Sequence, residues 1–132
     1  MDKMKLPIGY YLKKTDNLLT ERINKIHSDF GLTRTEWQIM NSIHEGVDKN
    51  TLLTQLLEFA SIEQLNELIT ELSKRSFVEE TPLLKLTDRG EEIFKSCLQK
   101  QTELRQKSMQ NITEQEYIQL ITTLEKIIDN LK

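Results

Sequence analysis

Three copies of one helix-start signal limit this chain to a mostly helical fold. This signal is the capping box. The side chain of a serine or threonine accepts a hydrogen bond from the backbone amide three residues later, and the Glu or Gln side chain at that later position accepts one from the backbone amide of the serine or threonine. The boxes are Thr33 with Glu36, Ser61 with Gln64, and Thr113 with Glu116. The 132 residues include only 4 glycines and 2 prolines, so few positions interrupt helices. We expect a single, mostly helical soluble domain.

Apolar periodicity and stop signals place six helices and one hairpin along the chain. The predicted helices cover residues 7–30, 34–44, 51–59, 62–74, 88–109 and 114–131. Residues 77–78 and 84–86 read as two short strands that turn at Thr81 and Pro82. Three helices followed by a hairpin is the order of a winged helix-turn-helix. The predicted fold class is mainly α with a small β-hairpin wing.

The last predicted helix has an apolar stripe that is unusual for a chain terminus. Its residues are Tyr117, Leu120, Ile121, Leu124, Ile127, Ile128 and Leu131. A stripe of this size is seldom left in water. It could pack within the chain or against a second copy, and helices projecting from both ends of a short chain favour the second copy.

Several function classes find no support in the residues. One cysteine and two histidines cannot form the usual metal clusters, and the sequence has no glycine-rich phosphate loop or serine elbow. We therefore predict no catalytic residues, no cofactor and no metal. The sequence has neither an apolar run of about 20 residues nor an apolar segment near Met1 typical of a signal peptide. A cytoplasmic protein without a membrane partner is expected.

The cysteine and the histidines have structural interpretations. Cys97 shares a helical face with Phe94, which predicts a buried apolar role rather than a redox sensor. His27 and His44 border apolar faces and are expected to be partly buried and hydrogen-bonded. Three aromatic residues on apolar faces are expected in the core first, although they could also line a sensing cleft: Tyr10, Tyr11 and Trp37.

The charge distribution is unusual for a DNA-binding lobe. Residues 33–90 contain six basic and ten acidic residues, a net charge of −4, whereas the whole chain carries −3. On the helix at 62–74, the face opposite the apolar stripe carries three carboxylates, Glu63, Glu67 and Glu71. DNA-reading helices usually present Arg or Lys instead, because the duplex is densely negative.

With these elements in order, the chain resembles the MarR family of bacterial transcription regulators. Three segments carry the resemblance: residues 31–40 from Gly31 through Trp37, residues 65–78, and above all Leu86-Thr87-Asp88-Arg89-Gly90. The last segment is similar to the leucine-threonine-x-x-glycine stretch that closes the wing in that family.

The resemblance implies a homodimer built from the terminal helices, with two winged-helix lobes that read a pseudo-palindromic operator. It implies a lobe at residues 33–90, dimerisation segments at 1–32 and 91–132, and often a cleft for a small-molecule effector. The interface residues expected are Ile8, Tyr11, Tyr117, Ile121, Leu124 and Ile128. The chain departs from the family pattern in its acidic helix, in a wing tip without arginine, and in a turn at residues 59–61 without glycine.

Two functional hypotheses follow. The first is a dimeric MarR-like regulator with weak or atypical binding to double-stranded DNA. Its expected DNA contacts are Asn66, Thr70 and Lys74 for bases or groove, and Arg75, Lys85 and Arg89 for phosphates. The alternative is a winged-helix protein that has lost operator binding and acts on a protein partner, as an antirepressor or an acidic DNA mimic.

Overall fold

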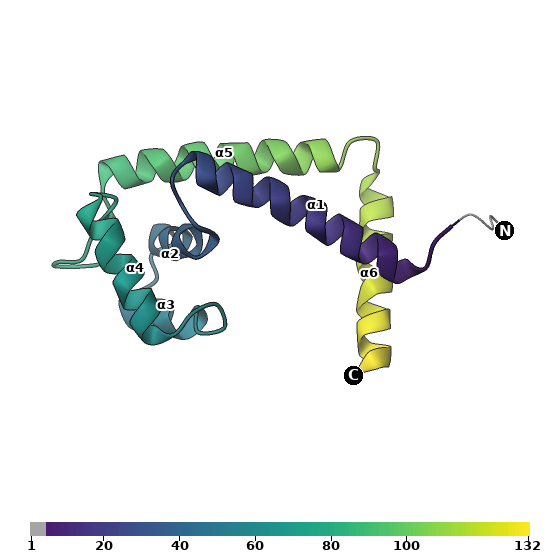
Figure 1. Cartoon of the computed structure of the whole chain (residues 1–132), viewed down its shortest axis with the longest axis horizontal. Coiled ribbons are helices and arrows are strands. Elements are labelled where there is room, and N and C mark those ends of the chain that lie inside the picture. The colour runs from purple at the N-terminus through teal and green to yellow at the C-terminus, as the bar shows by residue number, and fades with distance from the viewer. Residues whose placement is uncertain (1–4) are drawn as a thin grey trace. The chain divides into compact units, whose positions relative to one another are not determined.

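The computed structural model describes residues 5–132, and six helices and two strands lie within them (Figure 1). The elements are α1 (Ile8–Asp29), α2 (Arg34–His44), α3 (Lys49–Gln55), α4 (Ile62–Lys74), β1 (Val78–Glu79), β2 (Lys85–Leu86), α5 (Asp88–Ser108) and α6 (Glu114–Leu131). The mainly α fold class with a hairpin wing is confirmed. Predictions that concern residues 1–4, including the missing signal peptide and the start of the segment at 1–32, lie outside the described residues.

The chain divides into two compact units, one ending at Gln101 and one running from Thr102 to Lys132. In the first unit, α2 packs against α1, α3 and α4, and also against β2. The core of this unit is formed by fully buried side chains from α2, α3, α4 and α5. These are Ile39, Met40, Leu52, Leu65, Ile69, Leu72, Phe94 and Cys97. The second unit contains α6, none of whose residues is buried.

The capping boxes begin their helices as predicted. The Thr33 hydroxyl accepts from the Glu36 amide at 3.2 Å, and the Glu36 carboxylate accepts from the Thr33 amide at 2.9 Å. Ser61 and Thr113 begin α4 and α6 through the same reciprocal pair of bonds. Each box satisfies two backbone amides that have no partner within the helix.

One helix start differs from the prediction, and another helix is capped by a residue that the sequence did not single out. Helix α3 begins at Lys49 rather than near residue 51, because the Asp48 carboxylate accepts from the Thr51 amide at 2.8 Å. Helix α5 begins at residue 88 as predicted, but Asp88 does not cap it; Thr87 does so by accepting from the Gly90 amide at 2.9 Å. Asp88 is instead the first residue of the helix, where its charge suits the helix dipole.

The wing is short and is held at its base. The strands pair antiparallel, Val78 with Leu86 and Glu79 with Lys85. The first strand begins one residue later than predicted, at Val78 rather than at residue 77. The Thr87 hydroxyl also donates to the Ser76 carbonyl at 2.6 Å, and its amide donates to the Phe77 carbonyl at 3.0 Å. Thr87 therefore joins the end of α4, the start of β1 and the start of α5.

Candidate nucleic-acid interface

Helix α4 presents one buried face and one charged face. Leu65, Ile69 and Leu72 are fully buried, and Leu68 is partly buried against the core. On the opposite face, Glu63, Glu67, Thr70, Glu71 and Lys74 are exposed. The burial pattern confirms that the acidic stripe predicted from the sequence faces outward.

Three of the predicted DNA contacts lie together on this exposed face. Asn66, Thr70 and Lys74 line a shallow groove of about 400 Å³, together with Glu67 and Glu71. The groove therefore combines an amide, a hydroxyl and an ammonium group, all suited to base edges or phosphates. Two carboxylates lie among them.

The carboxylates of this face are not neutralised within the described part of the chain. In residues 5–132, none of Glu63, Glu67 and Glu71 forms an ion pair with a basic side chain. Three carboxylates thus oppose the single ammonium of Lys74 on α4. This surface repels a phosphate backbone more than it attracts one.

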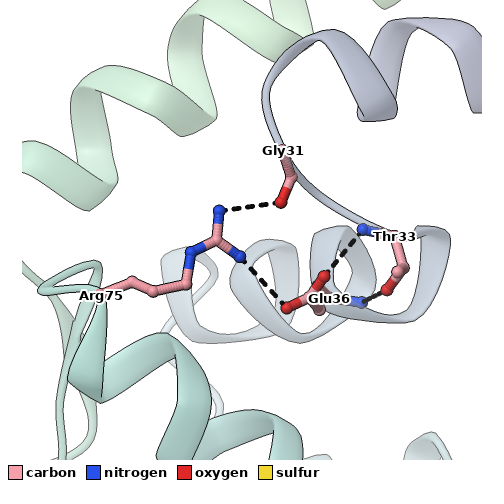
Figure 2. A network of polar contacts seen from close by, with 4 residues as sticks. All are labelled: Gly31, Thr33, Glu36 and Arg75. Atoms are coloured by element: carbon pink, nitrogen blue, oxygen red, sulfur yellow. Dashed lines mark hydrogen bonds and ion pairs between the residues drawn. The ribbon is translucent and has the colours of Figure 1, made fainter.

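The Arg75 side chain reaches toward Gly31 and Glu36 (Figure 2). One terminal nitrogen, Nη2, donates to the Gly31 carbonyl at 2.8 Å, and the other, Nη1, donates to Glu36 Oε2 at 3.4 Å. The guanidinium also lies 4.7 Å from the centre of the Phe77 ring. Both ends of its charged fork are therefore engaged inside the lobe.

We call the four residues Gly31, Thr33, Glu36 and Arg75 the Arg75 network. Glu36 is only 6% exposed, and its carboxylate serves both the cap of α2 and Arg75. Gly31 adopts φ +70°, a conformation that favours glycine, and a Cβ there would lie 3.0 Å from Arg75 Nη2. The network joins the end of α1, the start of α2 and the end of α4.

The wing and the start of α5 each contribute one exposed basic residue. Lys85 lies 3.6 Å from a Glu79 oxygen, and Arg89 lies over the Phe77 ring at 5.4 Å. Arg89 also lines an open groove of about 660 Å³ between the end of α4, the wing and the start of α5. Both side chains reach solvent, as phosphate contacts must, but Lys85 is already paired with a carboxylate.

The expected interface residues are largely exposed in the single chain. Ile8, Tyr11, Tyr117, Ile121 and Ile128 are exposed, whereas Leu124 is half-buried. The prediction that Tyr10 and Tyr11 lie in the core is wrong for the single chain, because about half of each side chain is exposed. Their rings pack edge to face on the surface of α1, with centroids 5.3 Å apart.

Trp37 and Cys97 are buried as expected. The Trp37 ring stacks on Phe94 with centroids 4.6 Å apart. Cys97 has no exposed surface, and burial raises the pKa of its thiol to about 11. A thiol that stays protonated near neutral pH is a poor nucleophile, which supports the structural interpretation.

The two histidines have different surroundings. The His44 side chain is 38% exposed and is hydrogen-bonded to Glu91 at 3.2 Å, so its predicted partial burial and its hydrogen bond are both confirmed. His27 is only 2% exposed and lies 2.9 Å from Gln101 Nε2. No group of three or more His, Cys, Asp or Glu residues within 5–132 is arranged to hold a metal ion.

Three residues of the lobe had roles that the sequence reasoning missed. Asp48 could have been identified, since an Asp three residues before Thr51 is a common N-cap spacing. Thr87 lies in the segment that carried the family resemblance, but its hydrogen bonds to Ser76 and Phe77 depend on the hairpin having folded back. Arg75 has partners 44 and 39 residues away, and no local pattern predicts them.

Sequence and structure comparisons give different results. No protein-family model matches the sequence, and no curated protein matches it. Many solved structures match, and the three described below share 14% to 23% identity with this chain. The reduced form of MarR from E. coli shares 23% identity at a TM-score of 0.69, covering 93% of this chain and 94% of that one.

Two further structures give the same result. A MarR family protein of Mycobacterium tuberculosis, solved in complex with DNA, shares 18% identity at a TM-score of 0.72, with 93% and 98% coverage. One from Bacillus stearothermophilus shares 14% identity at 0.71, with 94% and 92% coverage. Among residues 5–132, no helix is long and apolar enough to cross a membrane. The six helices, the hairpin wing and these matches along nearly the whole length establish that this chain has the winged-helix fold of the MarR family of transcriptional regulators, in a divergent form.

Proposed function

We propose that this chain is a dimeric transcriptional regulator that binds a pseudo-palindromic DNA operator. The observation that carries the proposal is the exposed face of α4, where Asn66, Thr70 and Lys74 line one groove on a capped helix of a winged-helix lobe. The fold is shared with a protein solved in complex with DNA. An amide and a hydroxyl on an exposed helix can read base edges in the major groove.

The proposed phosphate contacts come from the exposed basic residues near this face. Lys74 lies at the end of α4, Lys85 on β2 and Arg89 at the start of α5. Arg75 was expected in this set, but both of its terminal nitrogens are engaged with Gly31 and Glu36. Its contacts favour a role in positioning α4 over a role in binding phosphate.

The proposed dimer rests on apolar surface that the single chain leaves exposed. Helix α6 has no buried residue, although Tyr117, Ile121 and Ile128 lie along it. At the N-terminal end, Ile8 and Tyr11 on α1 are exposed as well. A second copy would remove this surface from water, which is the largest favourable term in most protein associations. Two lobes in one dimer would match the two half-sites of an operator.

A response to a small molecule belongs to the same proposal. A groove of about 250 Å³ lies beside α1 and the start of α2, and Asp16, Thr20, Asn24 and Arg34 contribute polar groups to it. Leu19 and Ile23 add apolar surface. We expect the effector to be a small polar or charged molecule and the protein to act in the cytoplasm.

A mobility-shift experiment with the DNA that flanks the protein's own gene, repeated across a salt series, tests the proposal. Each neutralised phosphate contributes about −0.9 to the slope of log K against log salt. Three basic groups per protomer give a slope of about −5 for a dimer by the same rule. Saturable binding with a slope of this size supports the proposal, whereas a failure to distinguish the flanking DNA from random DNA contradicts it.

A second function is favoured by one observation, the unpaired carboxylates of α4. A winged-helix protein with this face could act on a basic protein partner instead of DNA, as an antirepressor or a DNA mimic. The variant Glu63→Gln with Glu67→Gln distinguishes the two functions. Glu21→Gln with Glu45→Gln is the charge-matched control, on exposed sites outside α4.

The two functions predict opposite results for this variant. If α4 faces DNA, affinity for random DNA should rise about tenfold at low salt, because four negative charges per dimer are removed. The control pair should change it less. If the carboxylates bind a basic protein, the variant should lose that partner and gain no DNA affinity.

A further inference from the structure

Four rings form a continuous stack through the first unit, across α1, α2 and α5. The His27 ring on α1 stacks on Trp37 of α2 with centroids 5.8 Å apart, and Trp37 stacks on Phe94 of α5 at 4.6 Å. The His44 ring of α2 in turn stacks on Phe94, with centroids 4.3 Å apart. The buried end of the stack is His27, and the exposed end is His44.

The hydrogen bond between His27 and Gln101 fits a neutral imidazole. Gln101 Nε2 lies 2.9 Å from His27 Nε2 and also donates to Cys97 Sγ at 3.7 Å. An amide nitrogen can only donate, so His27 Nε2 accepts, and the imidazole is neutral with its proton assigned to Nδ1. His27 Nδ1 is buried and has no hydrogen-bond partner among the described residues.

We propose that His27 forms an acid-sensitive contact, which we call the joint, between the C-terminal end of α1 and helices α2 and α5. Protonation of His27 releases the end of α1 from these two helices. A second proton would have to go on Nε2, the atom that accepts from Gln101. Two donors would then face each other, and a charge would be buried beside the Trp37 ring. The cationic state is therefore stabilised only if the joint opens or the Gln101 amide turns over.

Burial and one nearby charge both disfavour a protonated His27. Burial, followed by the field of Arg34 on α2, lowers the pKa of His27 below its usual 6.5. On its own helix, Lys25 and Asp29 are paired with each other. On α5, the titratable Cys97 shares Gln101 with His27, and Lys100 and Glu103 flank Gln101 in the sequence.

The sign of the pH effect follows from this direction. Because the folded protein prefers the neutral imidazole, the unfolded chain binds more protons as the pH falls. The stability that depends on neutral His27 is complete above pH 6.5 and is lost as the pH falls through the lower pKa of the folded state. The unfolding equilibrium should shift by up to about tenfold for each pH unit in this window.

The joint is connected to α4 through backbone and side-chain contacts. The His27 carbonyl accepts from the Phe30 amide at 3.0 Å and from the Leu32 amide at 2.9 Å, which closes the end of α1. The turn between them contains Gly31, whose carbonyl is held by Arg75 at the end of α4. If the chain is the operator-binding regulator proposed above, opening the joint would also lower operator affinity in acid.

The fluorescence of Trp37 provides a direct test, since it is the only tryptophan and lies against His27. The full-length protein is titrated from pH 8 to pH 4.5 while tryptophan emission and far-UV circular dichroism are recorded. We expect an emission change with a midpoint below pH 6.5 in the wild type. The variant His27→Gln should lack it, because glutamine remains neutral. The control variant His44→Gln should retain it.

A second measurement covers the case in which His27→Gln does not fold. The two histidines give two imidazole signals in a carbon–proton NMR spectrum of the wild type, which His44→Gln assigns. Titration of His27 below pH 6.5, together with loss of amide-exchange protection at the end of α1, supports the joint. Titration at or above pH 6.5, protection that does not change with pH, or an emission change that persists in His27→Gln would overturn it.

Discussion

The Arg75 network gives the most direct test of how the lobe is held together. In the variant Arg75→Met, the side chain keeps its apolar length against Phe77 but loses its charge. The bond from Nη2 to the Gly31 carbonyl, at 2.8 Å, has a charged donor and is worth about 1.5 kcal/mol. The pairing with Glu36 is long, at 3.4 Å, and the Arg75 side chain is 30% exposed, so we assign it about 1 kcal/mol.

The expected loss of unfolding free energy for Arg75→Met is therefore about 2.5 kcal/mol. Glu36→Gln should cost less, about 1 kcal/mol, because glutamine can still accept from the Thr33 amide. Since each variant removes the same pairing, the double variant should be about 1 kcal/mol more stable than the sum of the two losses implies.

The measurement is urea unfolding followed by circular dichroism, at one fixed protein concentration because the proposed dimer makes stability concentration-dependent. The exposed pair Lys25 and Asp29 is the control. A double-mutant cycle with Lys25→Met and Asp29→Asn should give a coupling energy below about 0.5 kcal/mol. If the losses for Arg75 and Glu36 add within about 0.3 kcal/mol, the two side chains are not coupled and the reasoning fails.

Three further outcomes are expected. Gly90→Ala should lower the unfolding free energy by about 3 kcal/mol, because the added Cβ would lie 2.0 Å from the Phe77 carbonyl oxygen. Gly9→Ala, with open space around it, should instead stabilise α1 by about 0.5 kcal/mol. Thermal melts compare the two variants, and equal effects would contradict the packing at α5. The Cys97 thiol, buried and with its pKa raised to about 11, should resist alkylation at pH 8 until the protein unfolds, and complete labelling of the native protein within minutes by mass spectrometry would refute this. Sedimentation should give twice the chain mass for the wild type and a monomer or aggregate for Ile121→Asp, and a monomeric wild type would rule out the proposed dimer.

The helices were the part of the fold most open to prediction from sequence. Thr33, Ser61 and Thr113 carry their helix-start signals within four residues, so α2, α4 and α6 begin where predicted. The local signals at Asp48 and Thr87 were weaker or competed with a neighbour, so the start of α3 was misplaced and the cap of α5 was missed. How well a helix start can be predicted from one sequence therefore depends on how strong its local capping signal is.

In the candidate site as well, features set by local sequence were predicted and features set by long-range packing were not. The outward orientation of Glu63, Glu67 and Glu71 follows from helical periodicity alone and was predicted. The inward orientation of Arg75 depends on the Gly31 carbonyl, which reaches it only after α1, α2 and α4 have packed. Arginine was therefore assigned to phosphate by its charge, while long-range packing gave it another role.

The construction of the wing has an evolutionary consequence. Each strand is two residues long, and the contacts that hold the hairpin lie at its base, where Thr87 bonds Ser76, Phe77 and Gly90. The tip contributes little to the core, and Leu83 there is 75% exposed. Insertions, deletions and charge changes at residues 81–83, which are all exposed, should therefore be tolerated by the lobe. Selection could restore or remove a basic wing tip without destabilising the scaffold, so the hairpin can gain or lose a ligand preference faster than the helices beneath it can change.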